Sequence, residues 1–110
     1  MMMEELKKVC DEMEQRYGDG YLLRQLAEEC TELAQAALKL IRAQRRETPI
    51  SNAAARSKLI EELADVVIQC DAVYLTLLDV SERRRYYLVK DEKEARMRTR
   101  LEGGGMDARR

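Results

Sequence analysis

The chain lacks histidine entirely. This absence excludes imidazole-containing zinc sites, the Ser-His and Cys-His pairs that activate a nucleophile, and the Glu-x-x-His motif of di-iron bundles. The three cysteines form no CxxC motif, and each falls within a helical pattern among apolar neighbours. We therefore expect them to be small buried side chains in a reducing compartment: Cys10, Cys30 and Cys70.

Residues typical of sheets and turns are also scarce. Tryptophan and phenylalanine are absent, and the 110 residues include only one proline and five glycines, a composition that favours helix strongly over sheet. No uncharged run is long enough to span a bilayer, and 20 Lys and Arg against 21 Asp and Glu leave a net charge of -1. The basic run 83–85 has no interleaved aromatic residues. We expect a cytoplasmic all-α protein that binds neither nucleic acid nor membrane.

Hydrophobic periodicity predicts four helices. They cover approximately residues 4–17, 21–46, 54–78 and 80–102. The third is apolar nearly all round, a pattern typical of a helix that is buried on most of its surface. In so short a chain, this pattern predicts a four-helix bundle that self-associates, with the third helix at its centre and at the subunit interface.

The predicted helix ends coincide with residues that commonly begin or end helices. Glycines at 18 and 20 separate the first two helices, and Pro49 follows the second. Asp79 and Glu82 have the spacing of a capping box, which predicts where the fourth helix begins. We expect residues 1–103 to form one domain and residues 104–110 to be a disordered tail.

Carboxylates interrupt the apolar stripes of the two central helices. Glu29 falls on the stripe of the second helix, with Glu32 one turn later, and the third helix carries Glu62 and Asp65 at the same spacing. Residues three apart share a helix face. If the two helices pack antiparallel, the two pairs face each other and four acids converge.

Such a cluster requires a cation. Two like charges about 4 Å apart repel by roughly 1 kcal/mol in water and about 4 kcal/mol at an effective dielectric constant of 20. Because every candidate ligand is an oxygen, a hard dication fits best: Mg²⁺ first, Mn²⁺ second, and Ca²⁺ less well since there is no EF-hand loop. The alternative is that the acids are ordinary solvated charges on helix surfaces.

The order of the acids resembles a known family. EECTEL at residues 28–33, followed after a spacer by EELADV at residues 61–66, is similar to the EExxE and ExxD signatures of the MazG-like all-α nucleoside triphosphate pyrophosphohydrolases. The resemblance extends over approximately residues 17–103 and is closest to short single-domain members of bacteria and phages. It implies hydrolysis of a ribo- or deoxyribonucleoside triphosphate to the monophosphate and pyrophosphate, by a dimer or a tetramer.

The resemblance also implies roles for particular residues. The metal ligands would be Glu29, Glu32, Glu62 and Asp65. For such a reaction, a carboxylate that is not fully committed to the metal, Glu28 or Glu32, could accept the proton of the attacking water. Members of the family often carry cations on the last helix, where this chain has a basic face at spacings of three and four: Lys93, Arg96 and Arg100. The Lys-to-Asn arrangement that frequently follows in the family is missing, since the chain has a single asparagine, Asn52.

Two other interpretations fit the same sequence. In the first, the protein is a non-enzymatic helical interaction protein, whose acids are surface charges and whose third helix is an oligomer seam. In the second, the site is retained without activity, and the protein is a regulator that binds a metal or a nucleotide. The basic face of the last helix could likewise be a solvated surface in which lysines and arginines pair with neighbouring acids.

Overall fold

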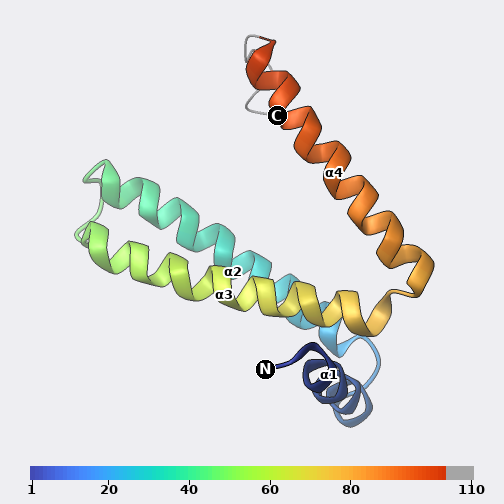
Figure 1. Cartoon of the computed structure of the whole chain (residues 1–110). Coiled ribbons are helices and arrows are strands. Elements are labelled where there is room, and N and C mark those ends of the chain that lie inside the picture. The colour runs from blue at the N-terminus through green and yellow to red at the C-terminus, as the bar shows by residue number, and fades with distance from the viewer. Residues whose placement is uncertain (104–110) are drawn as a thin grey trace. The chain divides into compact units, whose positions relative to one another are not determined.

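A computed structural model describes residues 1–103 of the chain. Within these residues the structure is all-α, with four helices and no strand (Figure 1), so the expected all-α class is confirmed. The predicted disordered tail, residues 104–110, lies outside the described residues. The helices are α1 (Met3–Tyr17), α2 (Tyr21–Gln44), α3 (Asn52–Leu77) and α4 (Val80–Glu102).

The chain divides into two compact units, of which the first, Met1–Leu77, contains α1, α2 and α3. In this unit α2 and α3 lie side by side as an antiparallel pair, and α1 packs where α2 begins and α3 ends. The second unit begins at Leu78 and contains α4. A capping box opens α4 as predicted: the Glu82 amide donates to the Asp79 carboxylate at 2.8 Å, and the Asp79 amide donates to the Glu82 carboxylate at 3.0 Å.

Two small apolar clusters lie along the first unit, one toward each end of the helix pair. At one end, Cys10, Leu22 and Ala72 bring α1, α2 and α3 together. At the other, the cluster joins α2 to α3 beside their connection and consists of Leu40, Ala43 and Ala55. The pairing of Leu22 with Ala72 and of Leu40 with Ala55 fixes the register of the two helices. This register places residues 29–32 of α2 opposite residues near 62 of α3.

The turn between α1 and α2 is held by a glutamate. Gly18 and Gly20 have φ values of 97° and 85°, which side chains with a Cβ rarely adopt. The Glu14 carboxylate accepts hydrogen bonds from the backbone amides of Gly20 at 3.2 Å and Leu22 at 2.7 Å. Glu14 therefore satisfies amides at the start of α2 that the helix itself leaves without partners.

The three cysteines differ in exposure. Cys10 is buried in the apolar cluster, whereas Cys30 and Cys70 are exposed, so the expectation of three buried thiols is wrong for two of them. Burial raises the pKa of the Cys10 thiol. The packing of α2 against α3 leaves both helices open to solvent at Cys30 and Cys70. Among residues 1–103, no helix has both the length and the apolar composition needed to cross a membrane.

Candidate metal centre

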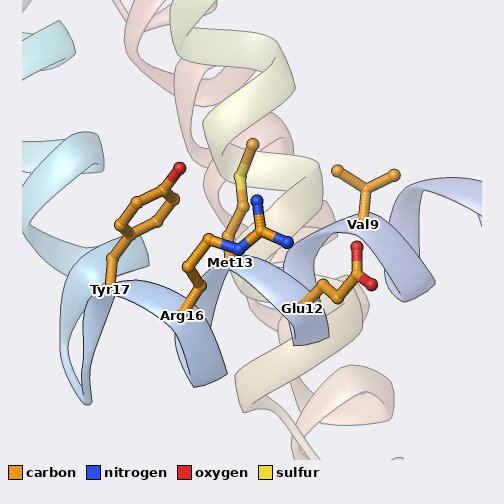
Figure 2. Close-up of a pocket in the computed structure, with 5 residues that line it drawn as sticks. All are labelled: Val9, Glu12, Met13, Arg16 and Tyr17. Carbon is orange, nitrogen blue, oxygen red and sulfur yellow. The ribbon is translucent and has the colours of Figure 1, made fainter.

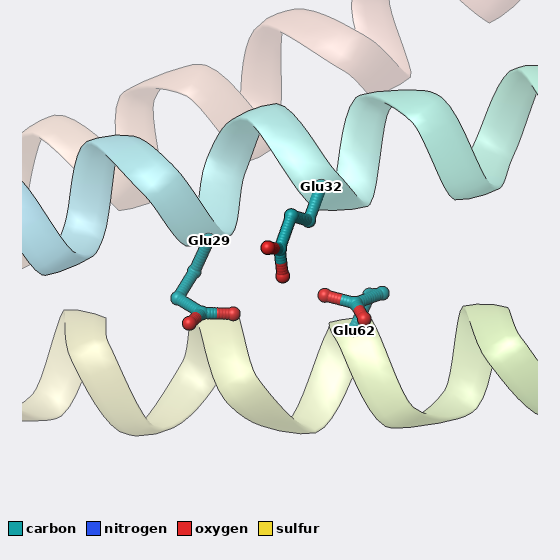
Figure 3. Close-up of side chains that lie close together, drawn as sticks. All are labelled: Glu29, Glu32 and Glu62. Atoms are coloured by element: carbon teal, nitrogen blue, oxygen red, sulfur yellow. The ribbon is translucent and has the colours of Figure 1, made fainter.

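Two glutamates of α2 face α3. Glu29 and Glu32 lie about one helical turn apart on the same face, and their carboxylates point into the space between the two helices (Figure 3). Glu29 is half-buried and Glu32 is exposed. The site is therefore accessible from solvent on the side of Glu32.

Glu62 enters the same space from α3 and is buried, with only 2% of its surface exposed. Its Oε1 forms an ion pair at 3.0 Å with Nζ of Lys58, whose side chain is 59% exposed. Its Oε2 is buried and has no hydrogen-bond partner among residues 1–103. A buried carboxylate oxygen without a partner is costly in free energy, which makes Oε2 a candidate ligand atom.

The three glutamates form one set, which we call the carboxylate cluster: Glu29, Glu32 and Glu62. One oxygen from each lies within 4.8 Å of those of the other two. Three of the four acids that were predicted to converge thus lie together, and the fourth, Asp65, is outside this set. The described residues place a single ion-paired ammonium, that of Lys58, against these three acids.

The charges of the cluster act on one another. Burial raises the pKa of the Glu29 carboxyl, and the neighbouring carboxylates of Glu32, Asp65, Glu62 and Glu28 raise it further, in that order. The pKa of the Lys58 ammonium is raised by its hydrogen bond to Glu62, by the charges of Glu62 and Glu61, and slightly by that of Glu32. The surroundings of Glu29 therefore disfavour its charged form, and a nearby positive charge would favour that form.

Asp65 and Glu28 are exposed and lie outside this set of three. Asp65 is one turn beyond Glu62 on α3, and its charge reaches Glu29. It is thus near the cluster, and its role as a fourth ligand stays a prediction. Glu28 precedes Glu29 on α2, and its predicted role in proton transfer is likewise untested.

The basic face predicted on the last helix lies on α4. Lys93 and Arg96 are exposed and Arg100 is half-buried. Lys93 borders a shallow hollow along α4 together with Val89 and Met97. Because α4 belongs to the second unit and the carboxylate cluster to the first, phosphate binding by these cations remains a prediction.

Two lysines beside the cluster were missed by the sequence reasoning. Lys39 of α2 and Lys58 of α3 border a pocket that also reaches Glu32 and Glu62. The available signal was spacing: Lys58 precedes Glu62 by four residues, and Lys39 follows Glu32 by seven, so each lies on the same helix face as its acid. The acid-bearing faces of α2 and α3 therefore each carry a lysine beside the cluster.

A second hollow, of about 110 Å³, lies on α1. Figure 2 shows its lining side chains, which α1 alone carries: Val9, Glu12, Met13, Arg16 and Tyr17. A depression between side chains of one helix brings together no groups from different elements. It offers less chemistry than the carboxylate cluster, to which α2 and α3 both contribute.

The donor set of the cluster suits a hard dication, because its candidate ligands are all carboxylate oxygens and the buried Oε2 of Glu62 has no partner among the described residues. Comparison of the chain with protein-family models, with curated proteins and with solved structures finds no match. A metal centre is therefore inferred from the geometry and chemistry of this chain's own residues.

Proposed function

We propose that the protein is a Mg²⁺-dependent, MazG-like pyrophosphohydrolase, which converts a nucleoside or deoxynucleoside triphosphate to the monophosphate and pyrophosphate. One observation carries the proposal. Glu62 is 2% exposed, yet its Oε2 has no partner among residues 1–103 and faces two more carboxylates. A carboxylate that serves only as a surface charge stays exposed and hydrated. A buried carboxylate loses this hydration, and a cation shared with neighbouring carboxylates compensates for the loss.

In this proposal Glu29, Glu32 and Glu62 hold the metal, with Asp65 as a fourth ligand. Mg²⁺ is preferred, Mn²⁺ is the alternative, and either supplies, when bound, neutralisation of phosphate oxygens and a water of lowered pKa. The exposed position of Glu32 leaves one side of the centre open to a substrate. The buried Glu62 forms the inner side.

Hydrolysis needs no covalent intermediate on the protein. The oxygen of water forms a bond to the α-phosphorus, the bond from this phosphorus to the bridging oxygen breaks, and pyrophosphate leaves. A carboxylate that is not fully committed to the metal accepts the proton of the attacking water. Glu32, at the solvent side of the cluster, and Glu28 are the proposed acceptors, and the α4 cations Lys93, Arg96 and Arg100 are proposed to contact phosphates.

A panel of ribo- and deoxyribonucleoside triphosphates tests this activity. With Mg²⁺ we expect monophosphate and pyrophosphate in equal amounts, without release of single phosphate groups, and no reaction with excess chelator. Product analysis must separate pyrophosphate from orthophosphate, since the two identify different bonds broken. If no triphosphate yields pyrophosphate with Mg²⁺ or Mn²⁺, the enzymatic proposal is wrong, and metal binding that persists would identify a regulator.

We also propose that the protein self-associates through α3. One side of α3 carries large apolar residues that are about half exposed or more: Ile60 at 65%, Leu63 at 46% and Val67 at 56%. Contiguous apolar side chains of this size mark interaction surfaces. Sedimentation equilibrium is expected to give two or four times the 12.8 kDa of the chain, whereas a monomer at micromolar concentration would contradict the proposal.

A further inference from the structure

A pocket adjoins the carboxylate cluster on the side toward the connection between α2 and α3. It has a volume of about 210 Å³ and is lined by Glu32, Gln35, Ala36, Lys39, Lys58 and Glu62. It shares Glu32 and Glu62 with the cluster, which means that a ligand in the pocket would also reach the metal ligands.

The pocket carries charges of both signs. It is lined by the carboxylates of Glu32 and Glu62, by the ammonium groups of Lys39 and Lys58, and by the side-chain amide of Gln35. The Lys58 ammonium pairs with Glu62 at 3.0 Å. Glu32 and Lys39 are seven residues apart on α2, which corresponds to about 10.5 Å along the helix axis. The buried Ala36 lies between them, and its small side chain leaves the space open.

This arrangement suits a polyanion more than a neutral ligand or a single anion. Ammonium groups and a primary amide are all hydrogen-bond donors, and the two lysines come from different helices. The carboxylates of Glu32 and Glu62 would repel an anion unless a cation lay between them and the anion, as the proposed metal does. The matching ligand is a chain of phosphates whose first group meets the metal centre and whose remaining groups meet the lysines.

We propose that Gln35, Lys39 and Lys58 form the subsite for the diphosphate group of the substrate, the part that leaves as pyrophosphate; this inference rests on the proposed function. When the bond to the α-phosphorus breaks, the bridging oxygen takes the electron pair and gains negative charge. Ammonium groups already in position stabilise this charge in the transition state. In the substrate complex, Lys58 therefore contacts both Glu62 and the leaving group.

The subsite also defines the orientation of the bound substrate. With the diphosphate beside Lys39 and Lys58, the α-phosphorus lies at the carboxylate cluster, and the nucleoside extends the opposite way, past Asp65. The sequence had assigned phosphate binding to α4 alone. Cations from α2 and α3 are built into the same unit as the acids, so their position relative to the metal ligands is set by the packing of that helix pair.

Calorimetric titration with inorganic pyrophosphate in the presence of Mg²⁺ tests the subsite without hydrolysis. Lys39→Met and Lys58→Met remove a charge while keeping a side chain that is compatible with a helix. Each is expected to weaken pyrophosphate binding about tenfold, because each removes a charge-assisted hydrogen bond. Lys58→Arg is expected to restore most of the loss, and inorganic phosphate should bind more weakly than pyrophosphate.

Two further measurements make the result specific. Lys7→Met is the matched control, because Lys7 also pairs with an acid four residues away, Asp11 at 2.9 Å, but lies on α1 outside the pocket. It should bind pyrophosphate like the wild type. Mn²⁺ titrated alone should bind Lys58→Met at least as tightly as the wild type, because the variant lacks the ammonium that competes for Glu62.

Failure of the subsite and failure of the proposed function give different results. If the protein releases pyrophosphate from a triphosphate but the Lys39 and Lys58 variants bind pyrophosphate as tightly as the wild type, the subsite is wrong and the function stands. If no triphosphate is hydrolysed while pyrophosphate binds and the lysine variants weaken it, the subsite stands and the enzymatic function is wrong.

Discussion

Replacing Glu62 with glutamine is expected to reduce pyrophosphate release about a thousandfold. The substitution keeps the size of the buried side chain and removes the negative charge that would bind the metal. A catalytic metal stabilises the transition state by several kcal/mol, and each 1.4 kcal/mol corresponds to a factor of ten in rate. The rate is measured as pyrophosphate released at saturating Mg²⁺.

The same variant is expected to lose its thermal response to Mg²⁺. In the wild type, a ligand at a hundred times its Kd adds about 2.7 kcal/mol to the free energy of unfolding, which corresponds to a melting temperature higher by roughly 10 °C or more for a chain of this size. Glu62→Gln should show little of this increase. Its stability in chelator should equal or exceed that of the wild type, because no charge is left buried and Lys58 is already largely solvated.

Glu61→Gln is the matched control. It makes the same change of charge at the adjacent position, on the exposed side of α3. We expect near-wild-type pyrophosphate release and a normal response to Mg²⁺. A Glu62→Gln protein that keeps wild-type activity would show that the carboxylate cluster is not the metal centre, whatever reaction the protein catalyses.

The helices were predictable because local signals agree at most of their ends. The glycines at 18 and 20 adopt positive φ values, and Asp79 forms both hydrogen bonds of the capping box. The predicted start of the third helix was two residues late. There the Ser51 hydroxyl accepts from the Ala54 amide at 3.1 Å, so α3 begins at Asn52 rather than Ala54. A serine in a polar connection gives only a weak signal of this kind.

The site was predictable in part. Carboxylates one turn apart on neighbouring antiparallel helices must come close if their faces meet, and Glu29, Glu32 and Glu62 do so. Which other side chains reach the site or remain exposed depends on the rotation of each helix about its own axis. Sequence periodicity defines this rotation only to within a fraction of a turn. That rotation leaves Cys30 and Cys70 exposed and brings Lys39 and Lys58 to the pocket.

In chelator, the wild-type protein is expected to lose stability as the pH rises from about 4.5, the ordinary pKa of a glutamate, through the raised pKa of Glu29. In this window Glu29 is protonated to a greater extent in the folded state than in the unfolded state, so the free energy of unfolding falls with increasing pH. Glu29→Gln removes this proton uptake and should flatten that part of the curve. Above the window, the variant should be the more stable protein.

Mg²⁺ is expected to reverse this order, because metal binding requires deprotonated carboxylates and therefore strengthens with pH. At neutral pH, Mg²⁺ should stabilise the wild type and leave Glu29→Gln nearly unchanged. Urea unfolding across the pH series, with chelator and with Mg²⁺, measures both effects. Glu12→Gln on α1 carries the same change of charge outside the cluster and should retain the wild-type slope. If Glu29→Gln follows the wild-type curve in chelator, Glu29 does not experience the repulsion that makes the cluster a cation site.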